Sequence, residues 1–331
     1  MTKAPADPGV QPMTDTPLCL VSDIGGTNTR VALADGTRLR EDSVRRFRNE
    51  GYPGLEPILR QYLADAGVSG VDAACVAAAG PVKDGVATLT NRDWTIDGDL
   101  LRRATGASRV AILNDLQAPG HALGHIAADR LIPVLAGPVE PRGTMLVVNV
   151  GTGFNAAPVH VTEAGRVVPP SECGHINMPI RTEADLRLAK FVEQAHGFPG
   201  VEDCLSGRGI ERLHAFVTTE AGNPQEWSST EIMAAIDTGT DPIAQQTAAL
   251  FTRLLGAETG NLALIHLPFG GIFLVGGLAR AFARHYGPLD FAGAFRDKGR
   301  FAEFMDNFAV WVLDDDFAPL TGCAVHLSHI R

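Results

Sequence analysis

One short segment combines the residue types that can hold a phosphate and a metal ion, namely Ser22-Asp23-Ile24-Gly25-Gly26-Thr27-Asn28-Thr29-Arg30. Apolar segments at 18–21 and 31–33 flank it and are typical of short strands, so the segment should form a hairpin turn. Two glycines in such a turn let backbone N–H groups approach a phosphate. A carboxylate at Asp23 is a ligand of the kind that Mg²⁺ prefers. The turn predicts a nucleotide-phosphate site, and an ordinary Gly-Gly turn between strands is the alternative.

Two further glycine turns follow apolar segments: Gly151-Thr152-Gly153 after 145–150, and Gly276-Gly277 after 271–275. The three turns could converge on the β- and γ-phosphates, the γ-phosphate and the adenosine of one nucleotide. The second turn also matches the dinucleotide fingerprint G-x-G-x-x-A, with Glu172 at a distance suited to a ribose. That fingerprint must open a helix, however, whereas the alternating residues after Pro158 predict a strand. None of the four lysines lies in a P-loop sequence.

Acidic and polar residues elsewhere could bind and activate a polyhydroxylated ligand. Asn114-Asp115 ends a predicted strand at 109–115, where a carboxylate could take the proton of an attacking hydroxyl. A helix N-cap is the alternative for this pair. Glu172 and His175 share one loop, for which an ion pair or a metal site is the alternative, and Glu202 could simply be solvated. Such a mixture of side chains can bond the several hydroxyls of a sugar.

The elements that must position these residues alternate between strand and helix, which indicates an α/β fold. From 18 to 115 the pattern is strand, hairpin, helix, strand, helix, strand, and a second unit begins near 116. Each unit opens on strand, glycine turn, strand. This approximate duplication predicts two related lobes with a ligand cleft between them. The clearest individual elements are helices at 53–66 and 241–266 and a helix starting at Ala279, with strands at 73–79, 109–115, 145–150, 156–161 and 271–275.

Composition limits the function classes. The 331 residues suffice for two cores, and a net charge of −10 argues against a nucleic-acid partner. Five scattered cysteines without a CxxC pair fit reduced thiols in the cytoplasm and argue against structural zinc. Residues 1–17 hold four prolines and no apolar run, which predicts a disordered tail and no signal peptide. Segment 261–279 lacks charge, but proline and glycine interrupt it, so no membrane span is expected.

Taken in order, the motifs resemble those of the bacterial glucokinase family of the non-ROK type, within the actin/hexokinase/Hsp70 ATPase superfamily. The similarity runs from about Leu18 to the C-terminus. The cysteine-rich zinc motif of the ROK relatives and a basic DNA-binding module are both missing. The segments that carry the resemblance are Asp23–Arg30, Thr90–Trp94, Ile112–Asp115, Glu172–His175, Glu202–Gly207, Gly260–Leu264, Gly270–Gly277 and Phe295–Phe301.

The resemblance implies a fold, a domain division and an activity. The fold would be a two-lobed actin-like ATPase (ribonuclease H-like) fold with an active-site cleft between the lobes. Residues 18–115, completed by about 313–331, would form a small α/β domain, and 116–312 a large one. The activity would be transfer of phosphate from ATP to the 6-hydroxyl of glucose with Mg²⁺, in a cytoplasmic protein that forms a homodimer.

The resemblance also implies residue roles. Asp115 would be the general base, and Asp23 would meet the metal indirectly, through Mg-ATP. The expected sugar-binding residues are Asn91, Asn114, Asp115, Glu172, His175 and Glu202. The expected nucleotide-binding residues are Ser22, Asp23, Ile24, Gly25, Gly26, Thr27, Gly151, Thr152, Gly153, Gly276 and Gly277.

Three residues depart from the family pattern. Asn149 and Asn155 stand where the second phosphate loop usually has glycine, and Asn177 replaces an acid. Asparagine tolerates positive φ, so the turn should survive, with less room near the γ-phosphate. Two alternative functions stay open: a non-catalytic sugar-binding sensor derived from a kinase, and a kinase for another hexose such as an amino-sugar.

Overall fold

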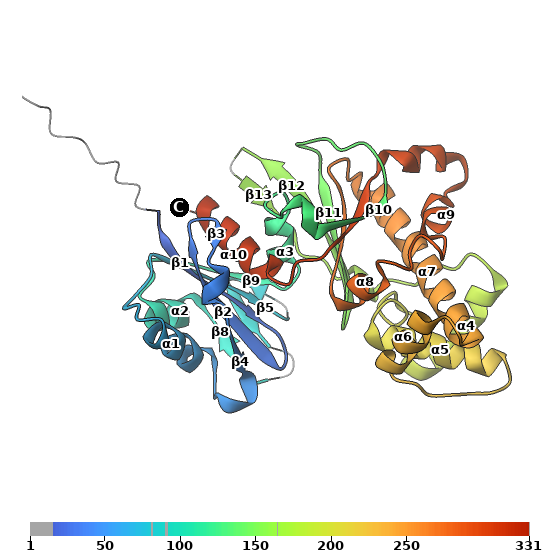
Figure 1. Ribbon diagram of the computed structural model, residues 1–331, viewed down its shortest axis with the longest axis horizontal. Helices are drawn as coiled ribbons and strands as arrows, with labels where there is room; N and C mark the ends of the chain where they lie inside the picture. The colour runs from blue at the N-terminus through green and yellow to red at the C-terminus, as the bar shows by residue number, and fades with distance from the viewer. Residues whose placement is uncertain (1–15, 81, 90–91, 164, 331) are drawn as a thin grey trace, which may run out of the picture.

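The computed structural model describes residues 16–80, 82–89, 92–163 and 165–330 (Figure 1). Within these residues the chain forms two six-stranded mixed sheets, a small three-stranded sheet and helices around them. The α/β prediction is therefore confirmed. The predicted tail falls almost wholly on residues 1–15, outside the described residues. Among the described helices, none has the length and apolar character that crossing a bilayer requires.

The first sheet has the strand order β3-β2-β1-β5-β9, and β4 pairs with β2 beside β3. β1 pairs antiparallel with β2 through the predicted hairpin, and parallel with β5. β5 is buried along its whole length, as expected for a parallel strand covered on both faces. The strands are β1 (Leu18–Ile24), β2 (Asn28–Asp35), β3 (Arg38–Leu39), β4 (Arg45–Arg48), β5 (Ala73–Ala78) and β9 (Arg109–Asn114).

Alternate residues of β1 face different helices. Leu20 and Ile24 pack with α1 (Leu55–Asp65) and α2 (Gly98–Thr105), whereas Cys19 and Val21 pack with α10 (Ala318–His329). The C-terminal helix thus returns to cover the first sheet. The small sheet, β6 (Val82–Lys83), β7 (Val86–Thr88) and β8 (Thr95–Ile96), lies between β5 and α2 in sequence.

The second sheet has the order β10-β15-β14-β11-β12-β13. As in the first sheet, a meander of three strands, β11-β12-β13, continues into strands that run parallel to the first of them, here β14 and β15. The predicted repetition of the opening pattern is therefore present in the strand connections. The strands are β10 (Leu131–Leu135), β11 (Met145–Val150), β12 (Phe154–Thr162), β13 (Gly165–Val167), β14 (Gly271–Val275) and β15 (Val310–Leu313).

One face of the second sheet packs on a long helix, α7 (Pro242–His266), whose predicted cap is confirmed because the Asp241 carboxylate accepts from the N–H groups of Ile243 and Ala244. The neighbouring helices are α4 (Glu183–His196), α5 (Gly207–Glu220), α6 (Ser229–Thr238), α8 (Gly277–Phe282) and α9 (Phe291–Arg296). Helix α8 starts at Gly277, two residues earlier than predicted. Short 3-10 helices occur at Glu41–Ser43, Asn49–Gly51, Ala128–Arg130, Cys173–His175, Gly299–Phe301 and Glu303–Asn307.

Helices α3 (Gln117–Ala122) and α10 pack against each other between the two sheets (Figure 1). Their crossing is close at Gly322, where an added Cβ would lie 1.7 Å from the carbonyl oxygen of Ala118. Ala118 joins the apolar cluster of Cys323 and Leu320. The two helices therefore connect the sheets through tightly packed backbone, and the ends of β9 and β15 lead directly into this junction.

Candidate active site

The second and third glycine turns touch each other. The β11–β12 turn is closed by a hydrogen bond that the Gly151 N–H donates to the Gly153 carbonyl at 3.0 Å. A Cβ on Gly151 would lie 3.9 Å from the Cα of Gly276, at the end of β14. Gly276 has a φ of +104°, and a Cβ there would lie 2.6 Å from the Val150 carbonyl oxygen. Only glycine suits this position, and the two turns form one surface.

The first turn carries its own support. Gly25 donates its N–H to the Asn28 carbonyl at 2.9 Å. Asn49, fully buried, donates to the Gly25 carbonyl at 2.8 Å and accepts from the Thr29 hydroxyl at 2.8 Å. Sequence reasoning missed Asn49, because it lies more than twenty residues away from the turn and no local pattern marks it. Its amide bonds the carbonyls of Gly25 and Gly26. Because the Gly25 N–H is used within the turn, the N–H groups of Gly26 and Thr27 are the ones that could meet a ligand.

Asp115 lies where the turns of both sheets meet. It follows β9 and lines two cavities, of about 210 Å³ and about 270 Å³. The smaller cavity also has Asp23, Asn149 and Gly276 in its wall. The walls of the larger cavity include Gly26, Thr152, Gly153, Glu202, Arg92 and Arg208. The structure thus brings together predicted residues from all three turns around this one carboxylate.

The surroundings of Asp115 change its acidity. Its pKa is raised from 3.8 to about 6, first because the surrounding protein removes water from the carboxyl, and second because the Asp23 carboxylate repels its charge. Glu172 adds to the repulsion. Asp115 is nevertheless partly exposed to solvent. A carboxylate with a pKa near 6 is ionised at neutral pH and accepts a proton more readily than an ordinary aspartate.

The Asn114 side-chain oxygen is used in hydrogen bonds to the backbone at the start of α3. The Asn114 side-chain oxygen accepts from the N–H groups of Leu116 at 3.1 Å and Gln117 at 2.6 Å, at the entrance to α3. The Asn114 side chain therefore bonds backbone N–H groups at the start of α3, although the N-cap position itself is Leu116. Within the described part of the chain, the Asn114 nitrogen Nδ2 has no hydrogen-bond partner, so it is the atom that could meet a sugar hydroxyl.

Glu172, His175 and Glu202 lie close together on connected loops. The Glu172 Oε2 and His175 Nε2 atoms are 4.0 Å apart, and both side chains are about 70% exposed (73% and 69%). Glu202 accepts from the Phe154 N–H through Oε2 at 2.9 Å, and its own N–H donates to the Gly174 carbonyl at 2.8 Å. The Glu202 segment is thus fastened to the loop of Glu172 and His175. Asn91 lies outside the described residues.

Two predicted nucleotide residues do not present their side chains to the cavities. The buried Ser22 hydroxyl donates to the Arg30 carbonyl at 2.9 Å, and Ile24 packs in the core. These two residues shape the hairpin and can offer a ligand only their backbone. Thr27 and Gly277 are exposed beside the turns to which they belong.

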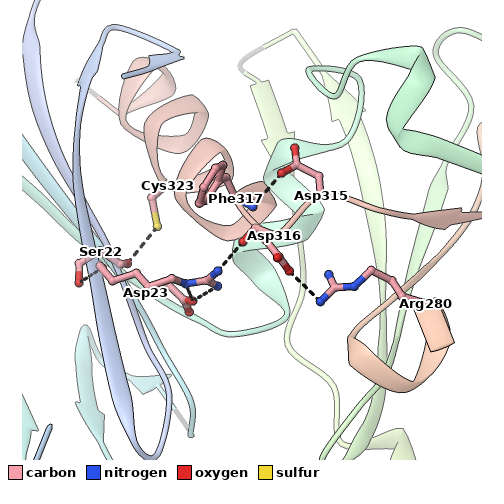
Figure 2. Close-up of polar contacts among 8 residues, drawn as sticks. Ser22, Asp23, Arg280, Asp315, Asp316, Phe317 and Cys323 are labelled. Atoms are coloured by element: carbon pink, nitrogen blue, oxygen red, sulfur yellow. Dashed lines mark hydrogen bonds and ion pairs between the residues drawn. The ribbon is translucent and has the colours of Figure 1, made fainter. Parts of the chain in front are cut away.

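Arg30 is a functional candidate that sequence reasoning missed. Its Nε and Nη2 atoms bond the Asp23 Oδ2 at 3.1 and 2.5 Å, and its Nη1 donates to the Asp316 carbonyl at 2.7 Å. The Asp316 carboxylate pairs with Arg280 of α8 at 2.7 Å. Figure 2 shows this chain of contacts from Asp23 across the segment before α10 to Arg280. It links the first hairpin to the second sheet's helix at the edge of the smaller cavity.

The residues present suit a metal that arrives with a nucleotide. Both Arg30 bonds go to Oδ2 of Asp23, so Oδ1 is the oxygen that could face Mg²⁺ or its water. Among the described residues, no cluster of three or more His, Cys, Asp or Glu could hold a metal ion unaided. A metal here would therefore depend on phosphate oxygens for most of its ligands.

The expectation for Asn149 and Asn155 is wrong in one respect. Neither residue has positive φ; they pair opposite each other in the β11–β12 ladder, outside the turn itself. The Asn149 Oδ1 lies toward Gly276, since a Cβ on that glycine would be 2.7 Å away. Asn155 instead bonds the loop of Glu172. Only Asn149 therefore takes room beside the predicted phosphate site.

Comparisons with known proteins agree on one family. A sequence model described as Glucokinase matches residues 20–330. The glucokinase of Saccharophagus degradans is 30% identical over 315 residues, which cover 94% of this chain and 98% of that protein. The crystal structure of a glucokinase from an Antarctic psychrotroph superimposes with a TM-score of 0.85 at 28% identity, covering 94% and 98% of the two chains. A Balamuthia mandrillaris glucokinase solved with glucose shares the fold, with a TM-score of 0.74 at 22% identity and coverage of 94% and 93%.

Proposed function

The chain belongs to the glucokinase family, whose members phosphorylate glucose with ATP, and we propose that Asp115 is the general base of that reaction in this protein. The observation that carries the proposal is the position of Asp115 between two cavities, one with Asp23 and Gly276 in its wall and the other with Glu202. A carboxylate there lies between a sugar hydroxyl on one side and the γ-phosphate that this hydroxyl attacks on the other. Its pKa of about 6 suits a base at neutral pH.

The remaining roles follow from which atoms are available. The sugar would lie against Asn114 Nδ2, Glu172, His175 and Glu202, with Asn91 as a further contact. The backbone N–H groups of the first two turns that are not bonded within those turns would bind the phosphates, and the third turn would face the adenosine. Mg²⁺, when bound with ATP beside Asp23, neutralises negative charge on the phosphates. Asp115 would orient the 6-hydroxyl, accept its proton at a carboxylate oxygen, and later release that proton to solvent.

We further infer that the fold is the two-lobed actin-like ATPase (ribonuclease H-like) fold, with its cleft between the lobes. The repeated strand connections of the two sheets support this assignment. So does the return of α10 to the first sheet, which agrees with a small domain of 18–115 completed by 313–331, and a large domain of 116–312. Closure of such lobes over the sugar would exclude water and limit ATP hydrolysis. The missing cysteine-rich motif favours the non-ROK branch.

We also propose that the protein is cytoplasmic and forms a homodimer. Five free cysteines, four of them buried, are consistent with a reducing cytoplasm. The family resemblance supports a homodimer with glucose as the small-molecule partner. The net charge of −10 argues against binding to nucleic acid.

Glucose-dependent release of ADP tests the proposed function. Purified protein with Mg-ATP should release ADP when glucose is added, and Asp115→Ala should abolish turnover while calorimetry still detects glucose binding. Glucose binding by the wild type without any ADP release would favour the sensor instead. A panel of glucose, mannose, fructose and N-acetylglucosamine would identify a kinase for another hexose. Normal turnover by Asp115→Ala would refute the assignment of the base.

A further inference from the structure

We propose that Asn155 is a positioning residue of the sugar site, which holds the loop of Glu172 in place from the hairpin that carries the second glycine turn. The inference rests on the proposed function, since it gives Glu172 a sugar to bind. It assigns to Asn155 a role on the sugar side of the cleft, although its position in sequence is next to the phosphate loop.

The Asn155 side chain bonds the backbone on both sides of Glu172. Its Nδ2 donates to the carbonyl of Ser171, the residue before Glu172. Its Oδ1 accepts from the N–H of Cys173, the residue after Glu172, at 3.2 Å. One amide group therefore uses its donor and its acceptor to fix the two peptide groups that flank this carboxylate.

The loop needs such a support because it has little of its own. Glu172 lies outside helix and strand, with φ −131° and ψ 41°, and a single 3-10 turn follows it. Its side chain is 73% exposed, so packing does not hold the carboxylate. An exposed carboxylate on an irregular loop binds a ligand well only if its backbone is fixed beforehand. Within the loop, the Cys173 N–H also donates to the Ser171 hydroxyl at 3.2 Å. The two bonds from Asn155 add a restraint from outside the loop, on β12.

Phe154, the residue before Asn155, bonds Glu202, the second acid of the proposed sugar site. The Phe154 N–H donates to Glu202 Oε2 at 2.9 Å, and the Glu202 N–H donates to the Gly174 carbonyl at 2.8 Å. Residues 154 and 155 thus hold Glu202 and Glu172 respectively. Both come directly after Gly153, the last glycine of the second turn. The start of β12 therefore joins the predicted phosphate turn to both sugar-binding acids.

Removing the Asn155 side chain should leave the hairpin folded. The backbone of Asn155 pairs with Asn149 in the β11–β12 ladder, and this pairing does not involve the side chain. Asn155→Ala therefore removes the bonds to residues 171 and 173, together with the bond that the Asn155 Oδ1 accepts from the adjacent Ala156 N–H at 2.9 Å. Asn149→Ala is the matched control, because it shortens the opposite member of the same ladder pair, whose side chain lies toward Gly276.

Steady-state kinetics and calorimetry of the two variants test the inference. For Asn155→Ala we expect the Kd and KM for glucose to rise about tenfold, because the hydrogen bond that a sugar hydroxyl donates to the Glu172 carboxylate is lost or weakened. The KM for ATP should change less than about twofold. For Asn149→Ala we expect the opposite pattern, with the larger change in KM for ATP. A double-mutant cycle on glucose affinity distinguishes this role from a general effect on folding. If Asn155 acts through Glu172, Asn155→Ala should have little further effect on the Kd for glucose in a Glu172→Gln background.

Each outcome separates this inference from the proposed function. A wild type that neither binds glucose nor releases ADP would overturn the proposed function and this inference with it. A wild type that does both, with an Asn155→Ala variant of unchanged glucose affinity or with equal losses for glucose and ATP, would overturn this inference alone. Should Asn155→Ala fail to fold, Asn155→Asp decides: it keeps the acceptor for Cys173 but loses the donor to Ser171, and a normal glucose affinity would refute the role.

Discussion

Activity at acidic pH should be governed by Asp115. The pKa of this carboxyl is about 6 in the unliganded protein, and a general base must be ionised to accept the hydroxyl proton. With that pKa, about 90% of the base is ionised at pH 7 and about 10% at pH 5. We therefore expect kcat/KM for glucose to fall about tenfold between pH 7 and pH 5, with the slope of a single proton.

The causes of the raised pKa can be separated by substitution. Asp23→Asn removes the carboxylate that repels Asp115 most strongly, so the acidic limb of the profile should move to lower pH. The variant should also bind Mg-ATP less well, which lowers the height of the profile but not its shape. Asp35→Asn is the matched control, because Asp35 lies at the opposite end of β2 from the turn and pairs with Arg40. It removes the same charge and should leave the acidic limb unchanged.

The assay is kcat/KM for glucose from pH 4.5 to 8 at saturating Mg-ATP and constant ionic strength. Samples returned to pH 7.5 must regain full activity, so that unfolding is not mistaken for titration. An acidic limb near pH 4, the usual range of an aspartate, would show that Asp115 is not the titrating base. An equal shift for Asp23→Asn and Asp35→Asn would refute the argument from proximity.

Three further changes have expected outcomes. Asp115→Asn should raise the melting temperature at pH 7.5 by about 1–2 °C in calorimetry and by nothing near pH 3.5. The pKa of Asp115 is higher in the folded protein than its unfolded value of 3.8, so this carboxyl disfavours folding only at a pH where it is ionised in the unfolded chain. Gly276→Ala should destabilise the fold by about 1–3 kcal/mol in urea and raise KM for ATP, because its φ of +104° and the nearby Val150 carbonyl exclude a side chain; an unchanged midpoint would contradict this. Gly322→Ala should cost at least about 3 kcal/mol by the same measurement, since its Cβ would overlap the Ala118 carbonyl between α3 and α10.

The elements were predictable where the local pattern alone determines them. Apolar residues at helical spacing predicted α7, and the aspartate before Pro242 predicted its N-cap. Unbroken apolar runs predicted β5 and β14. The Asp23–Arg30 pair could also have been found, because counting outward from the turn places these two residues opposite each other in the hairpin. The supports of Asn49 and Asn155 could not, since each bonds a segment sixteen or more residues away that only the folded chain brings near.

The two asparagines bear on the choice between a kinase and a sensor. In sequence they look like losses from a glycine-rich phosphate loop. In the structure they pair in the ladder below the turn, and Gly151 and Gly153 still form the turn itself. Asn149 alone lies toward Gly276, while the Asn155 side chain is used on the loop of Glu172. An asparagine at position 155 that bonds the loop of Glu172 and leaves the backbone of the turn in place gives no reason for ATP binding to fail. The sensor alternative therefore depends on Asn149 alone, and Asn149→Gly should raise ADP release markedly if crowding at that position limits the reaction.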